Sequence, residues 1–324
     1  MLRVTPWIPC AAMIMLGLAC PAGAQPYPGR PIRFIVPNPP GGGADLVARV
    51  VGQKLAVNLG QQVVIDNRAG AGGIIGTDLA AKSEPNGYTL MLGYTANLCF
   101  APSLFSKLPY DPVQDFAPVT LVGSTYYLLA AHPSVPVKSV KELIALAKAK
   151  PGQLNFASIG NGQGNHLAGE LFKNMAGVNL IHVPYKGGGP ALAAVLGGEA
   201  QLIFGSTLST LVHVKASRLR GLAITAAKRS AFAADLPTIA EAGVPGYEMS
   251  TWMGVLVAVD TPRELVAKLH AEIAGILQAA DVRQRLSGDG LEPLGSSPAE
   301  FAALIKADIA KWAGVIKGAG IRID

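Results

Sequence analysis

Short apolar runs alternate along the chain with glycine-rich loops and with segments whose apolar residues recur at helical spacing. The first unit has a β-type run at 32–36, a loop at 37–45 and a helix-like segment at 46–55. A second unit of the same kind occupies 62–81. Repeated strand–loop–helix units predict an α/β fold with a parallel sheet and right-handed crossovers.

The same pattern returns in the second half of the chain. Strand-like residues 154–158 precede a glycine-rich loop and a helix at 166–175, and residues 180–190 lead into a helix at 191–196. A further strand–turn covers 201–206. The length of 324 residues suits two domains, each with its own core.

Two strand-like runs, 119–123 and 126–131, indicate where the chain passes from the first domain to the second. We predict that residues 25–128 and 251–324 form domain 1 and that residues 129–250 form domain 2. The chain then returns to domain 1, where two helices with capping chemistry follow. Thr261 and Ser297 each precede a proline and lie three residues before a glutamate, which is a helix-start signature.

The glycine-rich loops are the candidate binding elements. In parallel sheets, ligands bind at the carboxyl ends of the strands, where these loops lie. A loop followed by a helix N-terminus presents unpaired N–H groups and the positive end of the helix dipole, which suits a carboxylate or a phosphate. The alternative interpretation is that each loop is only a turn.

Composition narrows the choice of partner. Half of the residues are hydrophobic and 15% are charged, which is typical of a compact globular protein. The net charge of +6 is spread without a Lys/Arg block, so we predict no nucleic-acid partner.

Motifs for catalysis, metals and cofactors are missing from the sequence. It has no His-Glu-x-x-His, Cys-x-x-Cys or Gly-x-Ser-x-Gly, and the glycines at 70–76 miss the dinucleotide-binding spacing. The five histidines are scattered. We therefore predict neither a metal site nor a cofactor, and a binding protein rather than an enzyme.

Residues 1–24 read as a signal peptide, with Arg3, an apolar stretch and an Ala-x-Ala site that predicts cleavage after Ala24. Lipid attachment at Cys20 is the alternative. Cleavage would leave Cys99 as the single cysteine, so the mature chain could form no internal disulfide, and we predict that Cys99 is buried.

An ordered series of motifs resembles the Bug, or TctC-like, family of periplasmic solute-binding receptors for tripartite tricarboxylate transporters. The motifs that carry the resemblance are Pro39-Pro40-Gly41-Gly42-Gly43-Ala44-Asp45, Asn67-Arg68-Ala69-Gly70-Ala71-Gly72-Gly73, Pro85-Asn86-Gly87-Tyr88-Thr89-Leu90, His166-Leu167-Ala168-Gly169-Glu170, Val183-Pro184-Tyr185-Lys186-Gly187 and Lys311-Trp312. The resemblance implies a two-domain Venus-flytrap fold with two crossovers. It also implies a monomer that binds a small carboxylate, an organic acid or an amino acid, and hands it to the membrane subunits.

Carried over by position, the resemblance assigns the ligand to loops of both domains. The implied ligand-binding residues are Asn38, Pro39, Pro40, Gly41, Gly42, Asp45, Thr95, Asn97, Ser158, Gly160, Gly164, Asn165, His166, Tyr185, Lys186, Gly187 and Ser206. Scaffold roles are the alternatives: Asp45 as a helix cap, Lys186 as a solvated side chain, and His166 as a partner of a backbone group. Two positions depart from the family pattern, since Asn38 replaces a common aromatic residue and Gly205 replaces a frequent aspartate.

Two other functions remain open at this point. A sensing receptor would present its closed form to a sensor kinase rather than to a transporter. An exported enzyme acting on a carboxylate would use Asp45, His166 or Lys186 as its acid or base.

Overall fold

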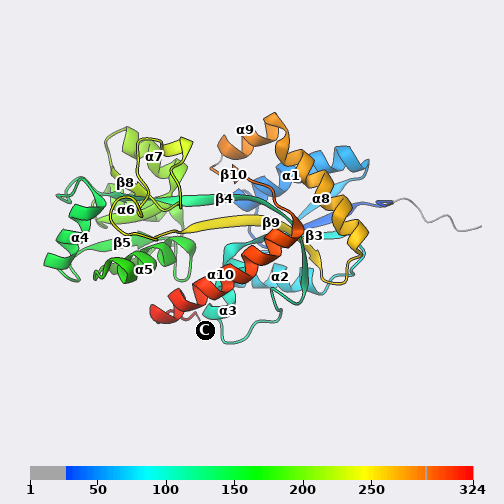
Figure 1. Cartoon of the computed structure of the whole chain (residues 1–324), viewed down its shortest axis with the longest axis horizontal. Coiled ribbons are helices and arrows are strands. Elements are labelled where there is room, and N and C mark those ends of the chain that lie inside the picture. Colours follow the sequence, from blue (N-terminus) through cyan, green and yellow to red (C-terminus); the bar gives the residue numbers. More distant parts are fainter. Residues whose placement is uncertain (1–26, 289, 324) are drawn as a thin grey trace, which may run out of the picture.

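The computed structural model describes residues 27–288 and 290–323, which form two lobes joined by long strands (Figure 1). The predicted signal peptide, the cleavage after Ala24 and the alternative lipid site at Cys20 lie outside these residues. Lobe 1 contains β1 (Ile32–Val36), α1 (Gly43–Leu59), β2 (Val63–Asn67), η1 (Ala71–Gly73), α2 (Ile74–Ala81), β3 (Thr89–Tyr94), η2 (Ala96–Phe100), α3 (Ala101–Leu104), α8 (Arg263–Gln278), α9 (Ala280–Gly288) and β10 (Glu292–Pro293). Lobe 2 contains α4 (Val140–Ala149), β5 (Asn155–Ser158), α5 (Gly164–Ala176), β6 (Ile181–Pro184), α6 (Gly188–Leu196), β7 (Leu202–Ser206), α7 (Thr207–Lys215), β8 (Arg220–Ile224) and η3 (Ala231–Ala233). The remaining elements are β4 (Phe116–Ala131), β9 (Ser250–Ala258) and α10 (Pro298–Gly318).

Strand β4 connects the lobes. Its first part pairs with β9, from Phe116 opposite Ala258 to Tyr126 opposite Ser250, and its last residues pair with β7 and β8 of lobe 2. The sequence predicted two separate runs here because Ser124 and Thr125 interrupt the apolar pattern. Both residues stay in the strand because β9 supplies their hydrogen-bonding partners.

The strand directions make the carboxyl ends of the two halves of the sheet face each other. The strand order is β2-β1-β3-β9-β4-β7-β5-β6, with β8 also paired to β4. Strands β3 and β4 are both antiparallel to β9, and β1 and β2 are parallel to β3, so β1, β2 and β3 run with β4 toward lobe 2. Strands β7 and β8 are antiparallel to β4, and β5 and β6 run with β7, so these four run toward lobe 1. We call the two facing surfaces, one on each lobe, where these strand ends lie the interdomain face.

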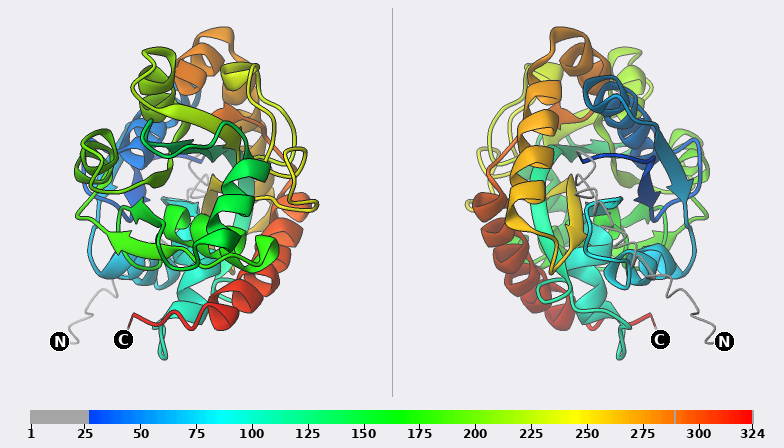
Figure 2. Two further views of the ribbon diagram at one scale, coloured as in Figure 1. Left: turned by 90° about the vertical axis from the view of Figure 1, so that its left-hand side faces the viewer. Right: turned by 90° about the vertical axis from the view of Figure 1, so that its right-hand side faces the viewer.

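Helices cover both faces of the sheet in each lobe (Figure 2). In β1, Ile32, Phe34 and Val36 pack in one apolar cluster with α1 and α8, whereas Ile35 belongs to the cluster on the opposite face. Alternate residues of a strand point to opposite faces, so a strand covered on both sides is apolar throughout. The run at 32–36, apolar except for Arg33, therefore predicted this strand correctly, and Arg33 lies partly exposed where it pairs with Asp66.

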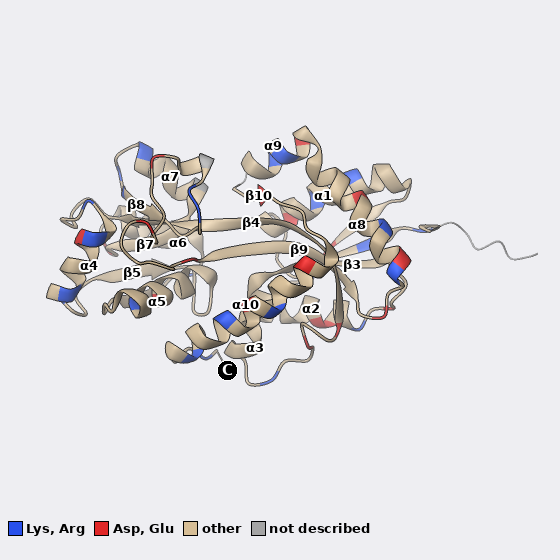
Figure 3. Cartoon of the chain, in the orientation of Figure 1, with Lys and Arg blue, Asp and Glu red and all other residues tan. Residues whose placement is uncertain are grey.

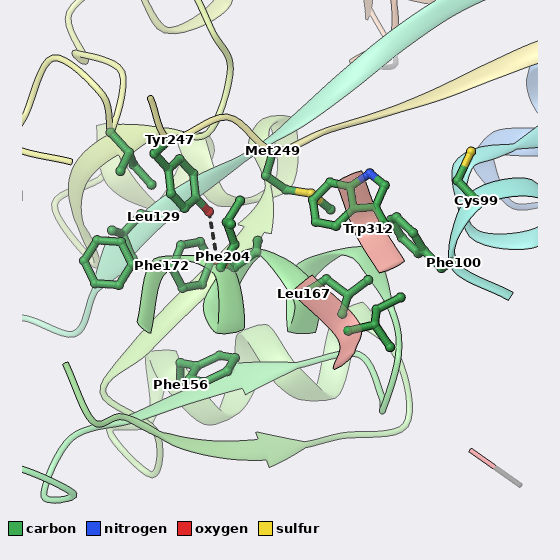
Figure 4. Packing of buried hydrophobic residues seen from close by; sticks show 14 of the residues in the cluster. Cys99, Phe100, Leu129, Phe156, Leu167, Phe172, Phe204, Tyr247, Met249 and Trp312 are labelled. Atoms are coloured by element: carbon green, nitrogen blue, oxygen red, sulfur yellow. Dashed lines mark hydrogen bonds between the residues drawn. The ribbon is translucent and has the colours of Figure 1, made fainter. Parts of the chain in front are cut away.

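Helix α10 crosses from lobe 1 to lobe 2. One apolar cluster contains Phe100 and Trp312 together with Phe156 and Phe172 of lobe 2 (Figure 4). The rings of Phe100 and Trp312 lie 5.1 Å apart, edge to face. The sequence placed this helix on domain 1 alone, but the structure extends its contacts to the second lobe.

The segment after α10 also touches both lobes. The Ile323 N–H donates to the Leu104 carbonyl of lobe 1 at 3.1 Å. The Ile323 side chain packs so closely on Gly162 of lobe 2 that a Cβ added at Gly162 would collide with it. Ile323 therefore bridges the lobes at a glycine-rich loop.

Helix ends and cysteine chemistry follow the sequence in part. Ser297 and Glu300 form the predicted capping box of α10. Thr261 does not cap α8, because its hydroxyl donates to the Ala258 carbonyl at 2.7 Å and Pro262 occupies the N-cap position.

Cys99 is buried with a free thiol, as predicted. Within the described part of the chain, none of the helices combines the length and the apolarity that a membrane crossing requires.

Candidate functional site

The loop after β1 lies at the interdomain face. Residues 39–42 are exposed, and Asn38 is half-buried with its carbonyl bound by the Asn67 amide at 3.1 Å. Asp45 in the first turn of α1 is buried, and its Oδ2 accepts from the Gly41 N–H and from Arg49 Nε, both at 2.9 Å. The hydrogen bond from Arg49 lowers the pKa of Asp45, so its carboxylate stays ionised. Asp45 thus shapes the loop through Oδ2 and pairs with Arg49, whereas its Oδ1 is buried without a hydrogen-bonding partner among the described residues.

A cavity of about 490 Å³ opens beside this loop. It runs from Gly41 and Gly42 along α1 to Lys54, and its other wall is formed by Asp281, Val282 and Arg285 of α9. All of these residues belong to lobe 1. The cavity is therefore a groove on one lobe and does not bridge the interdomain face.

Thr95 and Asn97, which the sequence assigned to the ligand, are fully buried. Thr95 Oγ1 accepts from the Trp252 N–H at 2.8 Å. The Asn97 side chain accepts from the Tyr94 N–H at 2.9 Å and donates to Thr77 at 2.6 Å. In this structure both side chains hold the turn after β3 in place rather than face the surface.

The loop after β5 is the counterpart in lobe 2. Ile159 and Asn161 are exposed, and Gly160 adopts a φ of +141°, which L side chains rarely adopt. Gly164 lies against β4 and β9 so closely that a Cβ there would collide with the Tyr127 hydroxyl. The glycines at these positions therefore allow both the sharp loop and its close approach to the strands that join the lobes.

Buried polar side chains brace this loop from beneath. Ser158 Oγ accepts from the Gly160 N–H at 3.1 Å and bonds His182 Nε2 at 2.5 Å. Asn165 Oδ1 accepts from the His166 N–H at 3.0 Å and the Ile159 N–H at 3.4 Å. All three predicted residues, Ser158, Asn165 and His166, are buried, so they act on the loop from inside.

His166 and His182 form a stacked pair with ring centroids 3.7 Å apart. His166 Nδ1 accepts from the Gly162 N–H at 3.0 Å, and its other nitrogen lies 3.7 Å from Glu170 Oε1. Burial, the nearby His182 and then Lys173 lower the pKa of His166 to about 3. Burial and then Lys173 lower the pKa of His182 to about 4. Both rings are therefore neutral at neutral pH, and His166 bonds a backbone group.

The last predicted residues follow β6 and end β7. Tyr185 is partly buried and its N–H donates to the Ser158 carbonyl at 2.9 Å, which ties the two loops together. Lys186 is exposed, and Gly187 is the N-cap of α6 with a φ of +110°. Ser206 is exposed at the N-cap of α7.

The structure gives a packing reason for Gly205. A Cβ at this position would collide with the Oγ1 of Thr210, which lies one turn into α7 and is fully buried. A side chain such as aspartate would therefore displace the first turn of α7. The absence of a side chain at Gly205 is therefore explained by the packing of α7, and it need not reflect the choice of ligand.

Five helices begin at the interdomain face, and none has a side-chain cap. They are α1 and α2 in lobe 1 and α5, α6 and α7 in lobe 2. Among the helices that begin elsewhere, α4 and α10 are capped by Ser139 and Ser297, whereas α8 also has no side-chain cap. The first N–H groups of a helix have no partner within the helix, so such ends can offer donors to a bound group. Two of these groups are already bonded within their own segments, the Ile74 N–H of α2 to the Ala71 carbonyl and the His166 N–H of α5 to Asn165 Oδ1.

Sequence reasoning missed the first residues of two of these helices. Gly43 begins α1 and Gly188 begins α6, each with open space where a side chain would project. A run of glycines was the available signal, but it did not show which glycine starts the helix.

Among the described residues, no group of three or more His, Cys, Asp and Glu side chains could hold a metal ion.

Comparison with known proteins adds independent information. The family model described as "Tripartite tricarboxylate transporter family receptor" matches residues 47–321. Protein BugT of Bordetella pertussis is 39% identical over 308 residues, covering 95% of this chain and 94% of that protein.

Solved structures agree with the sequence matches. The structure "R. palustris Rpa4515 with adipate" aligns with a TM-score of 0.79 and 36% identity, covering 92% of this chain and all of that one. The structure of MatC from Rhodopseudomonas palustris with bound malate has a TM-score of 0.75 and 32% identity, with 90% of this chain and all of that one covered.

Proposed function

The chain belongs to the family of tripartite tricarboxylate transporter receptors, and we propose that it binds a small carboxylate between its lobes and delivers it to the membrane subunits of such a transporter. As a member of this family it is a periplasmic solute-binding receptor and not an enzyme. The neighbours with adipate and with malate bind dicarboxylates, which supports a carboxylate ligand here.

The observation that carries the proposal is the set of uncapped helix N-termini on both sides of the interdomain face. The first turns of α1 and α2 face lobe 2, and those of α5, α6 and α7 face lobe 1. Of their N–H groups, those of Ile74 and His166 are already bonded within lobes 1 and 2, which leaves the others to a ligand. A carboxylate held between them would accept hydrogen bonds from both lobes. Because such bonds form only when the lobes approach, binding would favour the closed state.

The energetics suit a receptor that must also release its ligand. A hydrogen bond to a charged acceptor contributes about 1.5–3 kcal/mol, and ordering the ligand opposes this gain. A few such bonds therefore give affinity in the micromolar range or tighter, about −8 kcal/mol. No side-chain cation has to bind the first carboxylate.

A ligand screen tests the binding part of the proposal. The chain from Gln25 onward is purified, unfolded and refolded to remove any retained ligand, and heated with a panel of mono-, di- and tricarboxylates. Binding to the native state raises the melting temperature. If no carboxylate raises it, and calorimetry finds no binding, the proposal is wrong.

A matched pair of substitutions at Gly43 tests the role of the backbone. Gly43→Pro deletes one N–H at the first position of α1, where proline is tolerated, and the preceding Gly42 already has the extended conformation that proline requires (φ −87°, ψ 174°). Gly43→Ala keeps the N–H and adds a methyl group in open space. We expect the proline variant to bind the best ligand about tenfold or more weakly, with the alanine variant close to the wild type. Equal affinities would exclude this N–H from the site.

Delivery needs a cellular test. Deleting the gene should reduce uptake of the radiolabelled ligand, and the wild-type gene should restore it. The Gly43→Pro variant should restore uptake only at higher ligand concentration. Unchanged uptake in the deletion strain would contradict a role in transport.

A further inference from the structure

A histidine outside the predicted ligand-binding set lies beneath the loop after β5, residues 159–163. His182 is in β6, directly opposite Phe156 of the parallel strand β5, and the two rings lie 5.1 Å apart. The side chain of His182 is half-buried, and its Nε2 reaches Ser158 at the end of β5. Strands β5 and β6 and the loop 159–163 contain no Lys, Arg, Asp or Glu (Figure 3). Hydrogen bonds between neutral groups must therefore hold the shape of this loop.

The atoms around Ser158 identify the proton that His182 carries. Three polar atoms lie within hydrogen-bonding distance of Ser158 Oγ: the Gly160 nitrogen and the Gly160 carbonyl oxygen, each at 3.1 Å, and His182 Nε2 at 2.5 Å. The N–H can only donate, the carbonyl can only accept, and the hydroxyl has one proton to give. All three contacts are hydrogen bonds only if Ser158 donates to the carbonyl and His182 donates to Ser158. The geometry therefore requires the proton of the neutral His182 ring on Nε2.

His182 also supports the histidine that holds the second glycine of the loop. Its ring is stacked on that of His166, with the centroids 3.7 Å apart and the ring planes 12° from parallel. His166 Nδ1 accepts from the Gly162 N–H at 3.0 Å, so the proton of the neutral His166 ring lies on Nε2. Because burial lowers the pKa of both histidines, each ring holds one proton at neutral pH and keeps this role.

The two glycines held in this way are the flexible points of the loop. Gly160 and Gly162 have φ values of +141° and +69°. Glycine adopts positive and negative φ about equally readily, so the residues themselves do not fix this conformation. Both of their N–H groups are bonded to buried side chains, and the N–H of the exposed Asn161 between them has no hydrogen-bonding partner among the described residues. The Asn161 N–H is therefore the donor that this loop can offer to a ligand.

We propose that His182 is the positioning residue of the loop after β5, which it holds through Ser158 and His166 in the conformation that binds the ligand. The role rests on the proposed function and deepens it, because a ligand between the lobes is what this loop would contact. His182 itself does not touch the ligand. A loop that reaches the binding conformation only about a tenth of the time lowers the apparent affinity about tenfold.

Nuclear magnetic resonance of the protein with isotope-labelled histidine tests the proton count. The two nitrogens of a neutral imidazole ring differ in chemical shift according to which one holds the proton, and His182→Gln assigns the signals by removing one ring. We expect the Nε2 atoms of both His182 and His166 to be protonated at pH 7.5. A proton on Nδ1 of His182 would overturn the proposal, since Ser158 would then have to donate to the ring.

Two substitutions at His182 separate positioning from packing. His182→Leu removes the donor, whereas His182→Gln keeps an amide N–H that can donate to Ser158. Calorimetry with the best carboxylate should show at least tenfold weaker binding to His182→Leu, and binding to His182→Gln within threefold of the wild type. A role in packing alone would lower the stability in urea unfolding and leave the affinity of the folded protein unchanged. Wild-type affinity in a folded His182→Leu protein, or equal weakening in both variants, would overturn the proposal.

Ser158→Ala provides a second route to the same answer. Ser158 is fully buried, so its side chain acts on the ligand only through the loop. Combined with His182→Leu, it should weaken binding by much less than the product of the two single effects, because both remove the same hydrogen bond. Effects that multiply would overturn the connection between the two residues. If His182→Leu does not fold, Ser158→Ala decides alone: at least tenfold weaker binding is expected, and unchanged affinity would overturn the role.

The same measurements separate this role from the proposed function. If no carboxylate binds the wild-type protein, the proposed function is wrong and the positioning role falls with it. If the wild type binds a carboxylate and folded His182→Leu and Ser158→Ala bind it equally well, the positioning role alone is wrong.

Discussion

The stacked pair of His166 and His182 makes the stability of lobe 2 depend on pH. Burial lowers the pKa of His166 to about 3 and that of His182 to about 4, from about 6.5 in the unfolded chain. Above pH 6.5 the rings are neutral in both the folded and the unfolded state, so the pair does not change the free energy of unfolding. As the pH falls below about 6.5, the two histidines bind protons in the unfolded chain but not in the folded protein. The free energy of unfolding therefore decreases until the pH reaches the pKa values of the folded pair.

The size of this loss follows from the pKa values. One pKa unit corresponds to about 1.4 kcal/mol, so at pH 5 each ring accounts for at most about 2 kcal/mol. His166 is buried, but its stacking partner His182 is only half-buried, and water that reaches His182 screens the charge of the pair and reduces the combined loss to about 2 kcal/mol. A marginally stable protein would show such a loss clearly.

Urea unfolding of the ligand-free protein at pH 7.5 and pH 5.0 measures the loss. His182→Gln removes one ring while keeping a group that can bond Ser158, so it should reduce the loss by about half. His213→Gln on α7 is the control and should leave the loss unchanged. If the wild type and His182→Gln lose equal stability between these pH values, the pair is not the cause.

Three further predictions concern packing and helix ends. Gly164→Ala should destabilise the protein by about 1–3 kcal/mol in urea unfolding, because the new methyl group would collide with the Tyr127 hydroxyl; an unchanged midpoint would contradict the close packing. Ser297→Ala should cost about 1 kcal/mol by the same measurement, since it removes the capping box of α10, and a neutral effect would mean that water replaces the cap. Ile323→Ser should speed ligand release, followed by stopped-flow fluorescence, because it frees the loop at Gly162, and an unchanged release rate would show that this contact does not restrain the loop.

The sequence predicted most strands and helices because each is apolar on the faces that are covered. It missed α7 and α9 for physical reasons. Helix α7 is rich in Thr, Ser and Val, which are weak helix formers, and α9 carries few apolar residues. Packing on the sheet in the first case, and on α1 and α8 in the second, stabilises what local preference does not.

The sequence predicted which loops would lie at the interdomain face, but not which way their side chains point. Glycine-rich loops after strands indicate the interdomain face, since strand direction alone brings the carboxyl ends together. Thr95 and Asn97 follow a strand in the same way, yet the turn after β3 directs both inward, where they bond Trp252 and Thr77. Sequence position shows where a residue lies along the chain, whereas the side that its side chain faces depends on the local backbone.

The contact of Ile323 with both Gly162 and Leu104 has a practical consequence for anyone producing this receptor. A purification tag joined directly after residue 324 would be separated by a single residue from a side chain that packs on the loop after β5. It could alter affinity in a way mistaken for ligand preference. A fluorescent dye attached at Ile323 would, for the same reason, lie against residues of both lobes, Gly162 and Leu104, so this position suits a sensor of lobe movement better than it suits a tag.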